Sequence, residues 1–500
     1  MSLTRKLIPL LFIATIATAQ EKQKPWQEQV VPFQLPNGMR FLLLSRGETP
    51  TFTAYIRFRV GGLDEQKGKT GLAHLFEHMA FKGGKKLGTK NYPAEKIVLD
   101  KIEKVGEELS AEYKKGKESD PEKIKTLRDK LKVLHTEEEK YLVKEEISKK
   151  IQEAGGEHFN ATTSKDITSY FVSLPVDKME LWAQIESERI FFPILREFYE
   201  ERDVVMEERR MRVDDDPSGK LYETMIQTAF TEKEGARPHP YDWPTIGLKE
   251  DLLTLTRKDA EDFFQKYYTP QNAVGVIVGK ISIPETKKLL TRYFAKIPGH
   301  GPAPKNDWEP PLVFEKEKRI TFEEKAEPRL MIGFYKPAWS DPEEIVFDLL
   351  DEILSGGPTS RLHKKLVTEK RIAAGIETYG GVPGTRLTNL FLIQGEPIAP
   401  HSLKELEAGI LQVIDELKKN GPTTVEMEKA RNKIKSHLIW GLKTNDGLAS
   451  QLSYYETLGD WHYLTNYLGR IDAIGPEEVQ KTVQKYFTPE RRVVAELKKK

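Results

Sequence analysis

The sequence predicts an α+β protein with two homologous domains, each a mostly antiparallel sheet with helices packed on it. Three observations support this prediction: short alternating strands open the mature chain, helical stretches are grouped together, and one block of residues occurs twice. The length of 500 residues also exceeds that of one ordinary domain. A densely charged stretch interrupts the first half only, which predicts an insertion there.

The repeated block is the clearest sign of two halves. The residues from Gln265 to Pro270 (QKYYTP) reappear from Gln484 to Pro489 (QKYFTP), at an offset of 219. In both copies the block ends a helical stretch and leads into an apolar strand. A weaker match pairs His78 to Gly84 with Asp351 to Gly357 at an offset of 273, larger than the first offset by 54. An insertion of about that length in the first half explains both offsets.

The elements that open the first half follow from residue alternation. We expect strands from Val30 to Leu35, from Arg40 to Leu44 after a Pro-Asn-Gly turn, and from Phe52 to Val60. A helix is expected from about Leu72 to Phe81. These elements begin the first α+β domain.

The insertion, at about 101–154, is dense in Lys and Glu, with apolar residues at helical spacing and a break at Asp120-Pro121. We interpret it as a solvated helical hairpin, and a disordered charged linker is the alternative. The polar, Pro-rich stretch at 298–311 then separates a first domain, 28–297, from a second domain, 312–500.

The segment 1–19 has the form of a secretory signal peptide. Basic Arg5 and Lys6 precede an apolar run from Leu7 to Ala17, and a small-residue site predicts cleavage after Ala19. A disordered or buried N-terminus is the alternative. We therefore expect an exported protein, periplasmic or secreted, with no integral membrane segment after cleavage.

The composition limits the chemistry. Cysteine is absent, which excludes disulfides, thiolate metal sites and cysteine nucleophiles, so any metal must be held by His and carboxylates. A net charge of +1 gives no electrostatic reason to expect a nucleic-acid partner.

The predicted helix near residue 75 carries the strongest functional motif, His74-Leu75-Phe76-Glu77-His78. Residues at i, i+3 and i+4 share a helix face, so His74, Glu77 and His78 converge. Two neutral imidazoles can hold a zinc ion while the carboxylate acts on the water that zinc activates. The alternative is a helix face with two structural histidines. The motif predicts one Zn²⁺ per chain.

A catalytic zinc site needs a third protein ligand. The acidic helix from Tyr199 to Met211 offers two pairs at the same i, i+7 spacing, Glu201 with Glu208 and Glu200 with Glu207. Each pair spans two turns, about 10 Å, so only one member of a pair can bind the metal directly. Spacing alone does not choose between the pairs, and a solvated acidic face is the alternative for each residue.

Three segments together resemble the pitrilysin-type (inverzincin) zinc metallopeptidases. They are His74 to His78, the following Met79 to Gly84 (MAFKGG), and Glu201 to Glu208 (ERDVVMEE). Within that family the chain is most similar to bacterial relatives of mitochondrial processing peptidase. The resemblance covers nearly the whole mature chain, and it implies that the two domains form a clamshell.

The resemblance also implies roles for the acidic pair. In the family's pattern Glu208 is the third zinc ligand, and Glu201 is a carboxylate that orients a zinc-binding His or supports proton transfer. The separation between His78 and Glu208 is longer than is usual in the family. When the length of the insertion inferred from the two repeat offsets is subtracted, the separation between His78 and Glu208 falls to the length usual in the family.

Substrate binding is also implied by the resemblance. In relatives the edge strand that corresponds to 155–163 pairs with the substrate backbone, with Asn160 and Ala161 at the contact positions. Such β-addition gives affinity with little sequence preference. The alternative is an ordinary strand that begins with an Asn-capped turn. We also assign Phe81 to substrate binding.

The second half has no equivalent metal site. The weaker repeat places Phe347, Leu350 and Asp351 where the first half has its two His and Glu. Active relatives often use an Arg and a Tyr from this half near the metal, and here Val367 and Ala374 stand at those positions. We therefore hypothesise a heteromeric partner chain that supplies the Arg–Tyr pair; a homodimer is a further alternative.

The sequence thus predicts a zinc-dependent endopeptidase that hydrolyses short or unfolded peptides. Glu77 is the expected general base, with Glu201 in support. One rival is a catalytically weak scaffold or partner subunit of a heteromeric peptidase. The other is a zinc hydrolase that acts on a non-peptide amide.

Overall fold

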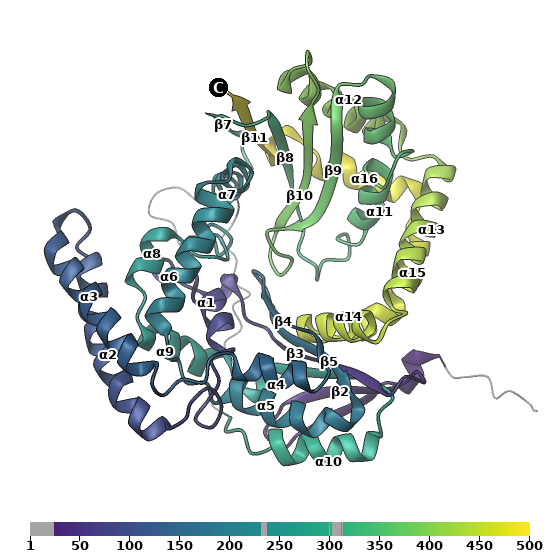
Figure 1. The fold of residues 1–500 in the computed structure, drawn as a ribbon. Coiled ribbons are helices and arrows are strands. Elements are labelled where there is room, and N and C mark those ends of the chain that lie inside the picture. The colour runs from purple at the N-terminus through teal and green to yellow at the C-terminus, as the bar shows by residue number, and fades with distance from the viewer. Residues whose placement is uncertain (1–24, 232–237, 300, 303–311, 313) are drawn as a thin grey trace, which may run out of the picture.

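The structure confirms an α+β fold of two domains, each built on one sheet. The computed structural model describes residues 25–231, 238–299, 301–302, 312 and 314–500. The predicted signal peptide lies outside the described residues, as does most of the predicted linker at 298–311. In Figure 1 the two halves stand one above the other, with the C-terminal half (green to yellow) at the top.

The first sheet has six strands in the order β1-β2-β6-β3-β5-β4. Neighbouring strands are antiparallel except β2 and β6, which run parallel. Among the strands of the described residues, β4 forms an edge of the sheet and pairs with β5 alone. The strands are β1 (Val31–Gln34), β2 (Arg40–Ser45), β3 (Thr51–Phe58), β4 (Glu157–Thr163), β5 (Thr168–Pro175) and β6 (Ala273–Gly279).

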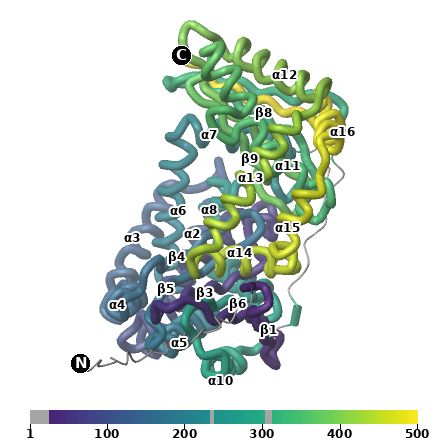
Figure 2. The backbone as a smooth tube through the Cα atoms, turned by 90° about the vertical axis from the view of Figure 1, so that its right-hand side faces the viewer, coloured from purple at the N-terminus to yellow at the C-terminus, as the bar shows by residue number. Residues whose placement is uncertain are grey.

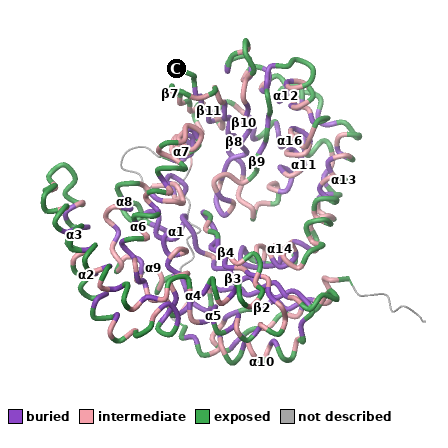
Figure 3. The backbone as a smooth tube through the Cα atoms, viewed as in Figure 1, coloured by how far each residue is buried: buried purple, intermediate pink, exposed green. Residues whose placement is uncertain are grey.

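Helices of the first half pack mainly against one face of this sheet, where α1 contributes Leu75 and Phe76 to a core shared with Phe58 and Ile277. The helices are α1 (Leu72–Met79), α2 (Tyr92–Tyr113), α3 (Pro121–Glu138), α4 (Glu146–Glu153), α5 (Met179–Phe191), α6 (Phe198–Arg209), α7 (Pro217–Phe230), α8 (Lys249–Thr254), α9 (Arg257–Tyr267) and α10 (Ile283–Phe294). Figure 3 shows the strands and α1 largely buried.

The second sheet has five strands in the order β7-β11-β8-β10-β9. The strands are β7 (Lys318–Glu324), β8 (Arg329–Lys336), β9 (Ala373–Val382), β10 (Asn389–Pro397) and β11 (Arg492–Lys499). The helices are α11 (Val346–Leu354), α12 (Leu403–Asn420), α13 (Thr424–Gly441), α14 (Asn445–Leu458), α15 (His462–Ala473) and α16 (Pro476–Tyr486).

The repeat found in the sequence is present in space. Helix α16 begins and ends at the repeat offset from helix α9, and β11 begins at the same offset from β6. The two sheets share one strand order, because β2-β6-β3-β5-β4 of the first corresponds to β7-β11-β8-β10-β9 of the second. In each sheet the first two of these strands form the parallel pair.

Two helices cross between the halves (Figures 1 and 2). Helix α7 of the first half covers the second sheet, where Met225 shares a core with Met331 and Tyr335. Helix α14 of the second half lies on β3 and β6, where Leu452 shares a core with Val276. Each half therefore buries apolar surface of the other.

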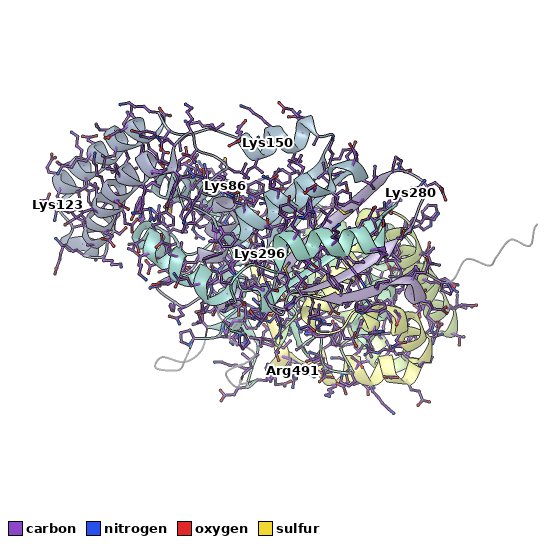
Figure 4. All side chains as sticks on the ribbon, turned by 90° about the horizontal axis from the view of Figure 1, so that it is seen from below. Lys86, Lys123, Lys150, Lys280, Lys296 and Arg491 are labelled. Atoms are coloured by element: carbon purple, nitrogen blue, oxygen red, sulfur yellow. The ribbon has the colours of Figure 1, made fainter. Side chains whose placement is uncertain are left out.

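The charged segment of the first half forms two long helices that pack on each other, α2 and α3. Helix α3 begins at the predicted break, where the Asp120 side chain accepts the main-chain N–H groups of Glu122 and Lys123. Figure 4 shows Lys123 of α3 at the far end of the segment, away from Lys86. Helix α2 starts at Tyr92, before the predicted limit of the insertion.

Each helix in the described part of the chain is too short or too polar to cross a bilayer.

Asp348 of α11 gives a testable pH dependence of stability. Burial and the nearby Glu344 carboxylate raise the pKa of Asp348 to about 7, while the Tyr467 hydroxyl donates to it at 2.6 Å. An acid whose pKa is raised in the folded state does not destabilise the protein at a pH below its unfolded-state pKa, near 4. It destabilises the folded state most at a pH above about 7, where the buried group must be charged. Asp348→Asn should therefore raise the free energy of unfolding at pH 8 by roughly 4 kcal/mol more than at pH 4.

Urea unfolding at the two pH values measures this difference. The exposed Asp415 on α12 provides the control, because Asp415→Asn removes the same charge from a solvated position. Equal effects of Asp348→Asn at both pH values would contradict the prediction.

Candidate active site

The start of helix α1 is set by a glycine and a buried carboxylate. Gly71 precedes the helix at φ 90°, and a Cβ there would lie 2.8 Å from the Ile246 carbonyl, so only glycine fits. The Glu65 carboxylate accepts hydrogen bonds from the main-chain N–H groups of Gly71 at 2.9 Å and of Ala73 at 2.8 Å. These bonds satisfy orphan donors of the first turn and fix the helix that carries the histidine motif.

Helices α1 and α6 bring together the three residues that the sequence predicts as metal ligands. The Nε2 atoms of His74 and His78 lie 3.6 and 3.7 Å from Oε2 of Glu208. One donor atom from each residue lies within 4.8 Å of the other two. Zinc bonds of about 2.0–2.2 Å in a tetrahedron separate the ligand atoms by about 3.4 Å, so this donor set fits a zinc ion with small adjustments.

The structure also separates the two acidic pairs that spacing alone leaves open. Glu208 faces the histidines, and Glu201 Oε2 lies 3.2 Å from Nδ1 of His78. Glu200 instead approaches His135 of α3 at 3.7 Å. The Glu207 side chain is 65% exposed and pairs with Arg210 at 2.9 Å. Of the two pairs, it is therefore Glu201 with Glu208 that points to the histidine motif.

Glu77 lies beside the metal donors and is held by β4. The hydroxyl of Thr163 donates to Glu77 Oε2 at 2.6 Å. Burial raises the pKa of Glu77, and the Thr163 hydrogen bond and the neighbouring His78 oppose that rise. A buried carboxyl with a raised pKa is suited to accept and release a proton near neutral pH.

The two histidines differ in electrostatic environment. Burial, with the nearby charges of His78 and Arg212, lowers the pKa of His74 to about 3, so His74 is neutral and able to bind a metal. Burial also lowers the pKa of His78, but the hydrogen bond and charge of Glu201 outweigh burial and raise it. Among the described residues, the buried Nδ1 of His74 has no hydrogen-bond partner.

The residues predicted to bind substrate lie around the open edge of the first sheet. Asn160 is exposed on β4, and Ala161 is buried beside it. Phe81, just after α1, packs against Phe159 with ring centroids 5.5 Å apart. Thr163, at the end of the same strand, contacts Glu77. Strand β4 therefore connects the predicted substrate-binding residues to the histidine motif.

A cavity of about 280 Å³ opens beside His74. Arg212 lines the cavity, and its Nη1 lies 2.7 Å from Oε1 of Glu208. Tyr222 and Trp243 contribute to its walls, and Pro383 reaches the cavity from the second half. The cavity therefore opens beside one predicted metal ligand, His74, and beside the arginine that pairs with another, Glu208.

The second half does not reproduce the metal donors. Within the described ranges, the one cluster of His, Asp and Glu donors that could hold a metal lies in the first half. Asp351, which the repeat aligns with His78, accepts a hydrogen bond from the Thr378 hydroxyl. Val367 packs at the margin of the second core and Ala374 is exposed on β9.

Sequence reasoning missed three contacts of this site. Thr163 on Glu77, Arg212 on Glu208 and Lys82 on Glu201 each hold a predicted functional carboxylate. Lys82 stands in the motif that follows the histidines, and Arg212 follows Glu208 by one helical turn, at i+4. The sequence positions of Lys82 and Arg212 could therefore have indicated two of these three contacts.

Comparison with known proteins identifies the family. A family model described as insulinase (peptidase family M16) matches residues 40–117, and one described as the peptidase M16 inactive domain matches residues 254–434. The chain belongs to the M16 (pitrilysin-type) zinc metallopeptidase family. This M16 chain therefore carries both the peptidase domain and the companion domain of the family.

Relatives of this M16 protein agree with that assignment. It is 25% identical over 491 residues to the zinc protease PqqE of Helicobacter pylori, covering 95% of this chain and 94% of that protein. It is 24% identical over 351 residues to the zinc protease YmxG of Bacillus subtilis, covering 69% of this chain and 81% of that one.

Solved structures show the same fold. A protease from Helicobacter pylori superposes with a TM-score of 0.77 at 23% identity, covering 94% of this chain and 99% of that chain. The first half of the periplasmic protease PqqL from Escherichia coli superposes with a TM-score of 0.67 at 16% identity, covering 94% and 92%. The predicted two-domain clamshell is therefore confirmed as the M16 fold.

Proposed function

We propose that this M16 chain is a zinc-dependent endopeptidase that cleaves short or unfolded peptides. The observation that carries the proposal is the convergence of His74, His78 and Glu208 within 4.8 Å of one another. Glu77 lies on the same helix as the two histidines, next to these donors. His74, His78 and Glu208 would hold one Zn²⁺, and the bound ion supplies Lewis-acid activation of water and of the scissile carbonyl.

The protein's own groups perform the proton transfers. Glu77, oriented through Oε2 by the Thr163 hydroxyl, takes a proton from the attacking water and passes it to the leaving amine. Its raised pKa favours the protonated form between the two transfers. Glu201 accepts a hydrogen bond from the Nδ1–H group of His78 and so fixes the ring with Nε2 toward Glu208.

The substrate class follows from the open edge of β4. An extended peptide can add to this edge by main-chain hydrogen bonds, next to Asn160 and Ala161, with Phe81 beside it. Only a chain free of its own secondary structure offers such a strand. Short or unfolded peptides therefore fit better than folded proteins.

The partner and the location belong to the same proposal. Val367 and Ala374 leave the second half without an Arg–Tyr pair, so we propose a heteromeric partner that supplies it, with a homodimer as the alternative arrangement. A catalytically weak subunit role is the second candidate function, and the missing pair favours it. The form of the N-terminal sequence supports export to the periplasm or beyond.

Metal removal tests the proposal. A fluorogenic peptide library should be cleaved by the purified chain, at a low rate because the Arg–Tyr pair is missing. Cleavage should fall at least about 100-fold after dialysis against a chelator, and one equivalent of zinc should restore it. Zinc binding without cleavage of any peptide would favour the subunit role or a non-peptide substrate. Full activity of the chain alone would contradict the need for a partner.

A further inference from the structure

The helical segment formed by α2 and α3 touches the candidate active site through a chain of charged groups. Lys82, in the turn after α1, places Nζ 2.6 Å from Oε1 of Glu201 and 2.9 Å from Oε2 of Glu197. The other oxygen of Glu201, Oε2, lies 3.2 Å from Nδ1 of His78. Each oxygen of Glu201 therefore has one partner, and Lys82 fixes the oxygen that His78 does not use.

Glu197 is itself held in a strained conformation. It precedes α6 with φ 56°, a left-handed conformation that costs a non-glycine residue free energy. Its N–H donates to Oε1 of Glu138 at 3.4 Å, and its carboxylate bonds Lys82. The strain persists because groups on both sides determine the position of Glu197.

Glu138 connects this series of charged groups to the segment that the sequence marks as an insertion. It is fully buried at the end of α3, and its Oε2 lies 3.1 Å from Nδ1 of His135. A second link runs in parallel. Arg196 bonds the main-chain oxygen of Lys82 and pairs with Glu95 of α2 at 2.7 Å. Both helices of the segment therefore hold the turn that carries Lys82.

We propose that Lys82 is a positioning residue for the metal centre, and that the α2–α3 segment fixes it through Glu138 and Glu197. The function of the segment is then to set Glu201 so that it orients His78. This inference rests on the proposed zinc site. Carboxylates that orient zinc-binding histidines contribute about 10- to 100-fold to metal affinity, which sets the expected scale.

An ordinary surface ion pair is the competing explanation for Lys82, and such pairs contribute little. The burial argues against it, because the Lys82, Glu197 and Glu201 side chains are only 21%, 13% and 15% exposed. The geometry also differs from an isolated pair, since Lys82 bridges two carboxylates that stand one turn apart at the start of α6.

Zinc affinity, measured by competition with a fluorescent chelator, tests the inference without any peptide. Lys82→Met should raise the zinc Kd about 10- to 100-fold, and Lys82→Arg, which keeps the charge, should restore it to within about 3-fold of wild type. Lys86→Met is the matched control. Lys86 is exposed shortly after the same turn, and no ion pair of its side chain is found among the described residues. Its variant should bind zinc as wild type does.

The contribution of the segment has its own test. Glu138→Leu, which removes the oxygen that accepts the Glu197 N–H, should raise the zinc Kd about 3- to 10-fold in the wild-type background. It should have little further effect when Lys82 is already Met, because the two residues act through the same series of contacts. Fully multiplicative effects would overturn the link through Glu138. A Kd for Lys82→Met equal to that of Lys86→Met would overturn the role of Lys82.

Two further measurements keep the outcomes distinct. Should Lys82→Met lose its fold by circular dichroism, Glu197→Gln decides instead: a zinc Kd raised about 3-fold or more supports the inference, and an unchanged Kd overturns it. A wild-type chain that binds zinc but cleaves no peptide would refute the proposed endopeptidase activity and leave this inference intact. A wild-type chain that binds no zinc would refute both.

Discussion

Replacing Glu77 with Gln is expected to lower kcat/KM for peptide cleavage about 10³-fold or more while zinc content stays at one ion per chain. Gln keeps the size of the side chain, and its amide oxygen can still accept the Thr163 hydroxyl. The amide cannot take a proton from water, and general-base catalysis contributes about 10²- to 10⁴-fold. Activity and metal content are measured on the same preparation, by a fluorogenic peptide and by elemental analysis.

The control for Glu77→Gln is the same change at an exposed position. Glu107 lies on the exposed face of α2, and Glu107→Gln should leave both activity and zinc content as in wild type. A Glu77→Gln protein that loses zinc but keeps partial activity would show that Glu77 is a ligand and not the base.

The parts of the structure that the sequence predicted are those that depend on local periodicity. The i, i+3, i+4 spacing placed His74, Glu77 and His78 on one face, because that spacing depends only on helix geometry. The repeated block predicted α16 and β11 from α9 and β6, since the same residues form the same elements in both halves. These results needed no knowledge of long-range packing.

The parts that the sequence did not predict depend on which surfaces meet. Helices α7 and α14 are each apolar on one face, but nothing in either sequence shows that the sheet they cover belongs to the other half. The Thr163 hydroxyl reaches Glu77 only because β4 ends beside α1. A single Thr has no spacing signal, and its partner is 86 residues away.

The second large expected effect is on zinc affinity, and it distinguishes Glu207 from Glu208 as the third zinc ligand. Glu208→Gln should weaken zinc binding by more than the roughly 10- to 100-fold expected for residues that only orient ligands, because it removes one of three protein donors. Glu207→Gln alters the adjacent residue of the same helix, whose side chain is 65% exposed and paired with Arg210. That variant should bind zinc as wild type does.

The pair of variants separates direct coordination from a general effect of charge near the site. Both substitutions remove one negative charge from α6 at neighbouring positions, so a long-range electrostatic effect would weaken zinc binding in both. Only a direct bond distinguishes them, since Oε2 of Glu208 lies 3.6 Å from His74 and 3.7 Å from His78. Zinc loss in Glu207→Gln with retention in Glu208→Gln would move the ligand to the other acidic pair and refute the site as proposed.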